Sequence, residues 1–321
     1  MSPDVFSAAP ELALEKKLRS VPGLIPLATL CVAVVLYAAL ALTAQLFAAG
    51  QLWIAALSGL LVHAFMLVVV HEGAHRAITG TRLDRVLMNV GAGLVLLPFW
   101  AEPFRRFHLI HHARTNVPDD PLWPASKRRL YRDHRGLYIV AELIPLLFSI
   151  LAIVGPAEAV PSVARAPRLS VALLALSFAV AGATAWLLAP QWTFLLATLL
   201  WTNAWGALRH VCEHFGFDDR IESNTFAFPL GFGIGNHAVH HAAPRLSWLT
   251  LALGLWRRPK QSGPLRAAFW LLTRRDFHHY QNDQNDQNDQ GIAHANRLPP
   301  GQVQVTALSK IPEPIAQVVR G

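Results

Sequence analysis

The chain has 321 residues, of which 53% are hydrophobic and 15% are charged, and its mean hydropathy is +0.33. A soluble domain carries about 25% charged residues, so this composition excludes an ordinary soluble protein and favours a membrane protein. The formal net charge is +8, but the basic residues flank apolar runs and form no stripe interleaved with aromatic residues, which argues against nucleic-acid binding. The two cysteines, Cys31 and Cys212, predict no disulfide.

The first apolar run covers residues 23–49 and follows a polar segment, 1–22, that contains Lys16, Lys17 and Arg19. The run is too long for the apolar core of a signal peptide, so we expect a spanning helix. The basic residues before it predict that the N-terminus lies in the cytoplasm.

A second apolar run, 51–70, follows the uncharged break Ala49-Gly50-Gln51. So short a connection predicts a tight hairpin of two spanning helices. The second helix would return to the cytoplasmic side, where it delivers His71 and His75.

Two further apolar runs, 84–100 and 137–155, have basic residues on both sides. The first is short and contains two glycines and a proline, which predicts a buried or re-entrant segment. The second contains Glu142 and Pro145, and we expect it to lie in the membrane interface or to dip in and return.

The runs 170–188 and 191–209 meet at an uncharged junction with an interfacial tryptophan and predict a second hairpin. If 137–155 also crossed the bilayer, His214 would lie on the side opposite His71, and the histidine clusters could not form one site. The predicted fold is therefore all-α and multi-pass, with four transmembrane helices in two hairpins and a cytoplasmic cap that carries the histidine clusters. Both termini are expected in the cytoplasm, and the expected location is a bacterial cell membrane.

Three regions follow from this organisation. Residues 1–22 form a cytoplasmic N-terminal segment, 23–256 the membrane catalytic domain, and 257–321 a basic cytoplasmic tail. The tail contains three Gln-Asn-Asp repeats between Gln281 and Gln290, a composition typical of disorder, and we assign no chemistry to it.

Ten of the fifteen histidines fall in four short clusters. They are His71, His75, His108, His111, His112, His210, His214, His237, His240 and His241. On a helix, residues three and four apart share a face, so each cluster can present neighbouring imidazoles in one direction. Ten imidazoles exceed what one four-coordinate zinc ion can use, which favours two metal ions.

Other functions are compatible with part of this pattern. His71-Glu72-Gly73-Ala74-His75 matches the zinc metalloprotease motif, in which two histidines hold zinc and the glutamate is the general base. A protease needs about one more ligand, however, which would leave most of the clustered histidines without a role. A non-catalytic metal-binding or transport protein is a further alternative, whereas a purely structural role is disfavoured because buried polar groups are costly in lipid.

Taken as a set, the clusters resemble the histidine boxes of the membrane fatty acid desaturase superfamily, HxxxH, HxxHH and a late HxxHH. The stretch from His108 to Pro121, including His111-His112-Ala113-Arg114-Thr115-Asn116 and Asp119-Asp120-Pro121, resembles the second box, and Asn236 to Pro244 resembles the last. The resemblance covers roughly residues 50 to 250. It implies two iron ions (Fe2+/Fe3+) held by the ten clustered histidines, of which His210 is the least certain, together with O2 activation and a lipid or fatty acyl substrate that enters from the bilayer.

Carboxylates beside the boxes complete the predicted site. Glu72 and Glu213 are candidates to bond imidazole N–H groups and fix their tautomers, rather than to bind metal themselves. Asn116, Asp120 and Asn236 are further candidates for this outer layer.

The reaction is less closely defined than the centre. Desaturation is the preferred reaction, and hydroxylation on the same centre is the alternative, because the motif of His71 to Arg76 and Glu213-His214-Phe215-Gly216 also resemble boxes of membrane alkane hydroxylases. The chain has no haem module, cysteine cluster or dinucleotide motif, so electrons are expected from a separate ferredoxin, rubredoxin or cytochrome b5 type donor.

Overall fold

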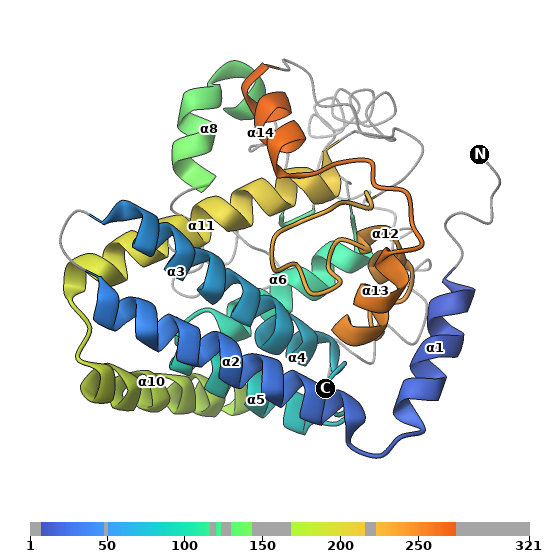
Figure 1. The fold of residues 1–321 in the computed structure, drawn as a ribbon, viewed down its shortest axis with the longest axis horizontal. Coiled ribbons are helices and arrows are strands. Elements are labelled where there is room, and N and C mark those ends of the chain that lie inside the picture. Colours follow the sequence, from blue (N-terminus) through green and yellow to red (C-terminus); the bar gives the residue numbers. More distant parts are fainter. Residues whose placement is uncertain are drawn as a thin grey trace, which may run out of the picture.

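The computed structural model describes residues 8–47, 51–115, 120–122, 130–142, 168–215 and 223–273. Within these ranges the named elements are all helical (Figure 1). They are α1 (Ala9–Arg19), α2 (Leu24–Leu46), α3 (Leu52–Phe65), the π-helix η2 (Met66–His71), α4 (Glu72–His75), α5 (Leu83–Leu94), α6 (Ala101–Ala113), α8 (Arg135–Glu142), α10 (Arg168–Leu188), α11 (Trp192–His214), α12 (His237–Ala242), α13 (Trp248–Leu255) and α14 (Pro264–Thr273).

Three helices of the described part are long and apolar enough to cross a membrane. They are Leu24–Leu46, Leu52–His75 and Leu169–Leu188. In the first and the last, less than a quarter of the most apolar stretch is buried, whereas 72% of it is buried in the second. The chain is therefore a membrane protein in which α3 lies inside the bundle, while α2 and α10 present leucines and valines outward.

The fourth expected span corresponds to α11, which has 23 residues and packs against α3 (Figure 1). The two helices approach closely because Gly59 has no side chain: a Cβ there would lie 2.5 Å from Cβ of Trp201. The C-terminal half of α11 carries Arg209, Glu213 and two histidines, which makes it less apolar than the three spans. Its crossing, and the cytoplasmic cap, remain predictions.

The predicted re-entrant run, 84–100, contains α5, which has 12 residues and is too short to cross a bilayer. It packs between α4 and α10. The predicted interfacial run, 137–155, begins in α8, and its residues from 143 onward lie outside the described ranges, as do the Gln-Asn-Asp repeats.

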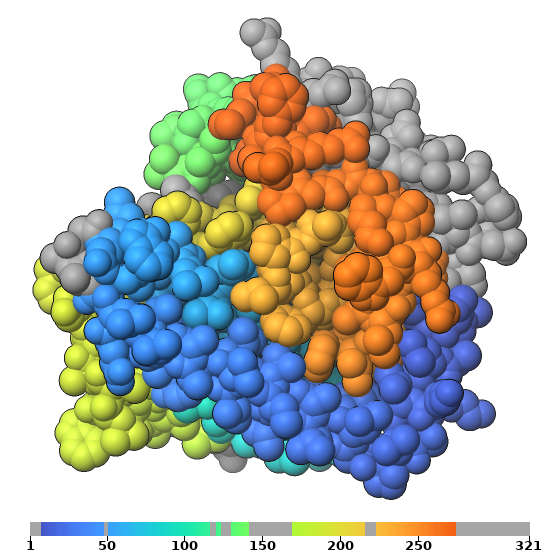
Figure 2. All heavy atoms as spheres, viewed as in Figure 1, coloured from blue at the N-terminus to red at the C-terminus, as the bar shows by residue number. Residues whose placement is uncertain are grey.

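Two ion-pair networks join segments that are distant in sequence. Arg85 on α5 makes two hydrogen bonds to Glu102 on α6, of 3.0 and 2.6 Å, and Asn89 donates to the same carboxylate. At the other end of the chain, Glu11 on α1 pairs with Arg258. Because α1 also packs on α13, the N-terminal helix and the segment with α12 and α13 lie together over one end of the molecule (Figure 2).

Candidate metal centre

The first pair of histidines lies at the end of the helix that begins as α3. The helix widens into the π-helical turn η2, whose last residue is His71. It ends before Arg76, whose φ of 57° is left-handed. A π-helical turn changes the direction in which the following side chains point, and such turns are frequent at functional sites. Both His71 and His75 are buried.

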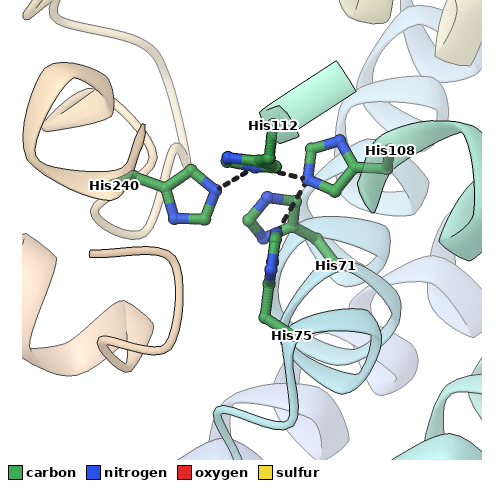
Figure 3. Close-up of side chains that lie close together, drawn as sticks. All are labelled: His71, His75, His108, His112 and His240. Carbon is green, nitrogen blue, oxygen red and sulfur yellow. Dashed lines mark hydrogen bonds between the residues drawn. The ribbon is translucent and has the colours of Figure 1, made fainter. Parts of the chain in front are cut away.

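Five histidines form the first cluster, which we call the five-histidine cluster. It contains His71, His75, His108, His112 and His240, with one ring nitrogen of each within 4.8 Å of all the others. Figure 3 shows the five rings, from α4 and η2, α6 and α12, turned toward one another. The Nε2 atom of His108 lies 2.9 Å from that of His75 and 3.2 Å from that of His112, which in turn lies 3.1 Å from Nε2 of His240.

Four more histidines form the second cluster, which we call the four-histidine cluster. It contains His111, His214, His237 and His241. The Nε2 atom of His214 lies 3.1 Å from that of His111 and 3.2 Å from that of His237, and the Nε2 atoms of His237 and His241 are also 3.2 Å apart.

The two clusters are neighbours because α6 and α12 contribute to both. On α6, His111 joins one cluster and His112 the other, since consecutive helical side chains diverge by about 100°. The same division separates His240 from His241 on α12. The rings of His112 and His241, one from each cluster, lie with their centroids 4.3 Å apart.

Carboxylates lie behind the imidazoles on the side away from the clusters. Nδ1–H of His111 donates to both oxygens of the fully buried Asp120, at 2.9 Å each. Nδ1 of His71 lies 3.3 Å from Glu72 and is hydrogen-bonded to it, whereas Nδ1 of His237 lies 3.4 Å from Glu213 without a hydrogen bond to a described residue. A carboxylate on Nδ1 fixes the tautomer that leaves Nε2 as the electron-pair donor.

Glu72 has a second partner that a sequence motif does not reveal. Its other oxygen accepts a 2.6 Å hydrogen bond from the backbone N–H of Trp248, at the start of α13. The next residue back, Ser247, donates its N–H and its hydroxyl to Glu15 on α1. The only sequence signal for this contact is the two acidic residues, Glu11 and Glu15, that precede the basic residues Lys16, Lys17 and Arg19.

The remaining predicted residues lie at the edge of the clusters or beyond them. His210 lies behind His214, with ring centroids 5.3 Å apart, and forms a third close group with Glu213 and His214. Asn236 is buried, and its side chain donates to Glu11 and to the carbonyl of Leu251. Within the described part of the chain, its side chain makes no hydrogen bond to an imidazole. Asn116 lies outside the described ranges.

Five imidazoles of the two clusters suit metal binding in their protonation state as well as in their geometry. Burial lowers the pKa of His108, His112, His237, His240 and His241 well below the ordinary value of 6.5, so each is neutral at pH 7. Neutral imidazole is the form that binds a metal.

One buried nitrogen also lacks a partner that a metal would supply. Nε2 of His71 points into the five-histidine cluster and has no hydrogen bond to any described residue. An unpaired polar atom in an apolar interior is costly, and a bound ion would remove that cost. The donor set therefore fits metal ions that prefer nitrogen ligands.

Comparison with protein families gives one match. The family model described as Fatty acid desaturase matches residues 47–273. This stretch includes every described helix from α3 to α14 and all ten clustered histidines, and it leaves out α1 and α2. No curated protein matches the chain.

Proposed function

The chain belongs to the fatty acid desaturase family, and on that basis we propose that it is an O2-dependent di-iron oxidoreductase that introduces a C=C bond into the alkyl chain of a membrane lipid. The observation that carries the proposal is the division of nine imidazoles, seven of them buried, into adjacent clusters of five and four. A single zinc ion, as in a protease, would use only one of the two clusters.

We assign one iron to each cluster. The five-histidine cluster would hold the first with His71, His75, His108, His112 and His240. The four-histidine cluster would hold the second with His111, His214, His237 and His241, and His210 stands behind it as a possible tenth ligand. Bound there, the two irons would supply the oxidising power, drawn from O2, that removes hydrogen from an unactivated methylene.

The chain's own residues would orient the ligands and exclude water. Asp120 holds Nε2 of His111 toward the four-histidine cluster, and Glu72 links the first histidine box to α13. His111, His237 and His240 are each at most 1% exposed, so bulk water is kept from the nitrogens. Such a site could hold one methylene of an alkyl chain in place while the surrounding solvent is excluded.

The overall reaction needs reactants from outside the chain. Two neighbouring methylenes lose two hydrogen atoms, and O2 takes these with two electrons and two protons to give two waters. The electrons would come from a ferredoxin, rubredoxin or cytochrome b5 type donor, because the sequence has only two cysteines and no motif for a redox cofactor of its own. The histidine clusters and both termini would face the cytoplasm.

The test compares wild type with His111→Ala in cells whose lipids are profiled, alongside metal analysis of the purified proteins. We expect wild type to carry about two iron ions per chain and to produce lipids two mass units lighter with a new double bond. His111→Ala should lose most of the product, whereas His134→Ala, which alters an exposed histidine outside the clusters, should retain it.

Other products would contradict the proposal in distinct ways. An alcohol in place of an alkene would indicate hydroxylation by the same centre. About one zinc per chain with no iron would indicate a protease, and the absence of reductant-dependent O2 consumption would indicate a protein that binds metal without catalysis.

A further inference from the structure

Two glutamates of α1 are buried against the rest of the molecule, although this helix lies outside the residues that match the family model. Glu11 is 3% exposed and Glu15 is 8% exposed, and they lie one turn apart on the same face of the helix. Lys16 and Lys17 of the same helix are exposed. A buried carboxylate is costly unless donors hold it, so the partners of the glutamates indicate where α1 is anchored.

Glu15 holds the start of α13, which lies beside α1 (Figure 1). Its Oε2 atom accepts hydrogen bonds from the backbone N–H of Ser247, at 3.1 Å, from the hydroxyl of the same residue, at 2.7 Å, and from the hydroxyl of Thr250. Ser247 is the N-cap residue of α13, and both it and Thr250 are fully buried. Three donors on one charged oxygen fix the first turn of α13 relative to α1.

The first turn of α13 is bonded in turn to the first histidine box. The backbone N–H of Trp248, next to Ser247, donates to one oxygen of Glu72 at 2.6 Å. The other oxygen of Glu72 is hydrogen-bonded to Nδ1 of His71. A path of buried hydrogen bonds and one peptide bond therefore leads from Glu15 to a ring of the five-histidine cluster.

A second path reaches the same box from its other end. Nε of Arg19 lies 2.6 Å from Oε1 of Glu15, and Nη2 of Arg19 donates to the carbonyl of Ala77 at 2.9 Å. Ala77 lies two residues after His75, in the loop that follows α4. Glu15 is therefore linked to both ends of the first box, by way of α13 and by way of Arg19.

The four-histidine cluster has contacts of its own that do not involve Glu15. The segment before α12 is bonded to the end of α11, because the backbone N–H of Asn224 donates to the carbonyl of Glu213 at 2.8 Å. Asp120 orients His111 from a different part of the chain. The bonds of Glu15 thus bear on the first box, which belongs to the five-histidine cluster alone.

From these contacts we propose that Glu15 is a positioning residue that fixes His71, and through it the metal site of the five-histidine cluster. Its charge matters because three donors and a guanidinium converge on it, and a side chain that cannot accept their bonds leaves buried donors unpaired. The inference rests on the proposed function only in that the five-histidine cluster binds iron.

The test measures how readily the iron-loaded protein loses iron to a graded series of chelator concentrations. We expect Glu15→Ala to release one of its two irons at a chelator concentration about tenfold lower than wild type does, and the other at the wild-type concentration. Glu15→Gln, which keeps the size of the side chain and loses its charge, should lie between the two. Lys16→Ala is the matched control, because it alters the neighbouring, exposed residue of the same helix, and it should retain iron as wild type does.

Double variants identify which iron is affected. Glu15 and Glu72 act along one path, so adding Glu15→Ala to Glu72→Gln should weaken iron binding little further. Asp120→Asn acts on the four-histidine cluster, so its effect and that of Glu15→Ala should add, and this double variant should lose both irons at lowered chelator concentrations. A purely structural defect would not produce this pattern.

Three results would overturn the proposal. Loss of both irons together in Glu15→Ala, with a lower unfolding temperature of the metal-free protein, would show a general packing defect. Full additivity with Glu72→Gln would show that Glu15 does not act through that residue, and iron retention equal to that of Lys16→Ala would show that α1 has no influence on the centre. Wild type that takes up no iron would contradict the proposed function itself, whereas the three results above leave it intact.

Discussion

At the scale of single residues, a carboxylate bonded to Nδ1 of a histidine decides which ring nitrogen faces the cluster. Asp120 is the clearest example, since it is fully buried and bonds Nδ1 of His111 with both oxygens. It also accepts the backbone N–H of Leu122, so its own position is fixed. Asp120 therefore holds the imidazole of His111, in the four-histidine cluster, in an orientation that depends on the local backbone.

We expect Asp120→Asn to lower iron affinity about 10- to 100-fold, because the amide holds the imidazole less firmly and makes it less basic. The measurement is iron per chain after dialysis against a graded series of chelator concentrations. Asp133→Asn, which alters an exposed carboxylate paired with Arg132, is the control and should bind iron normally. Equal iron retention by the two variants would disprove this role for Asp120.

At the scale of helices, the first histidine box depends on close packing between α4 and α5. Gly73 lies between His71 and His75, and a Cβ at this position would lie 2.7 Å from both the carbonyl oxygen of Asp84 and Cβ of Met88. Neither neighbour is the flexible end of a side chain, so α5 would have to move. The glycine in this box therefore serves helix packing.

Accordingly, Gly73→Ala should lower the free energy of unfolding by about 1–3 kcal/mol, as overpacking of a core does, and should reduce iron binding. Thermal unfolding in detergent and metal analysis measure the two effects. Gly182→Ala on α10 is the control, because a Cβ there meets no atom within 4 Å and alanine favours a helix. A Gly73→Ala protein as stable as wild type would rule out the packing argument.

At the scale of the whole molecule, the histidine-bearing segments come from helices that begin far apart in sequence. Boxes on α4, α6, α11 and α12 can meet only if α3 and α11 both end on the same side of the bilayer. The outward leucines of α2 and α10 and the buried surface of α3 support a bundle in which these helices run across the membrane.

The predicted topology places the second hairpin turn outside the cell and the loop after α4 in the cytoplasm. A cysteine in place of Gln191 should therefore react with an impermeant maleimide in intact cells, and a cysteine in place of Arg82 only after permeabilisation. The unsubstituted chain, with Cys31 and Cys212, gives the background. Reaction of both positions in intact cells would contradict four crossings.

The sequence alone was sufficient to predict the helical class and the family, and it shows ten histidines in four short clusters. Helical runs depend on local hydrophobicity and histidine boxes on short spacings, so both are visible without a structure. The predicted runs 23–49 and 170–188 agree closely with α2 and α10. Glu72 and Asp120 were also predicted beside the imidazoles, and the structure places both there.

The tertiary structure alone decided how the histidines divide. His111 and His112 are adjacent on α6 but belong to different clusters, because their rings point in different directions and meet histidines from other helices. The spacing within one box cannot reveal those partners. The contact of Glu15 on α1 with Ser247 has the same origin. These two residues are distant along the chain, and only the packing of the whole bundle brings them together.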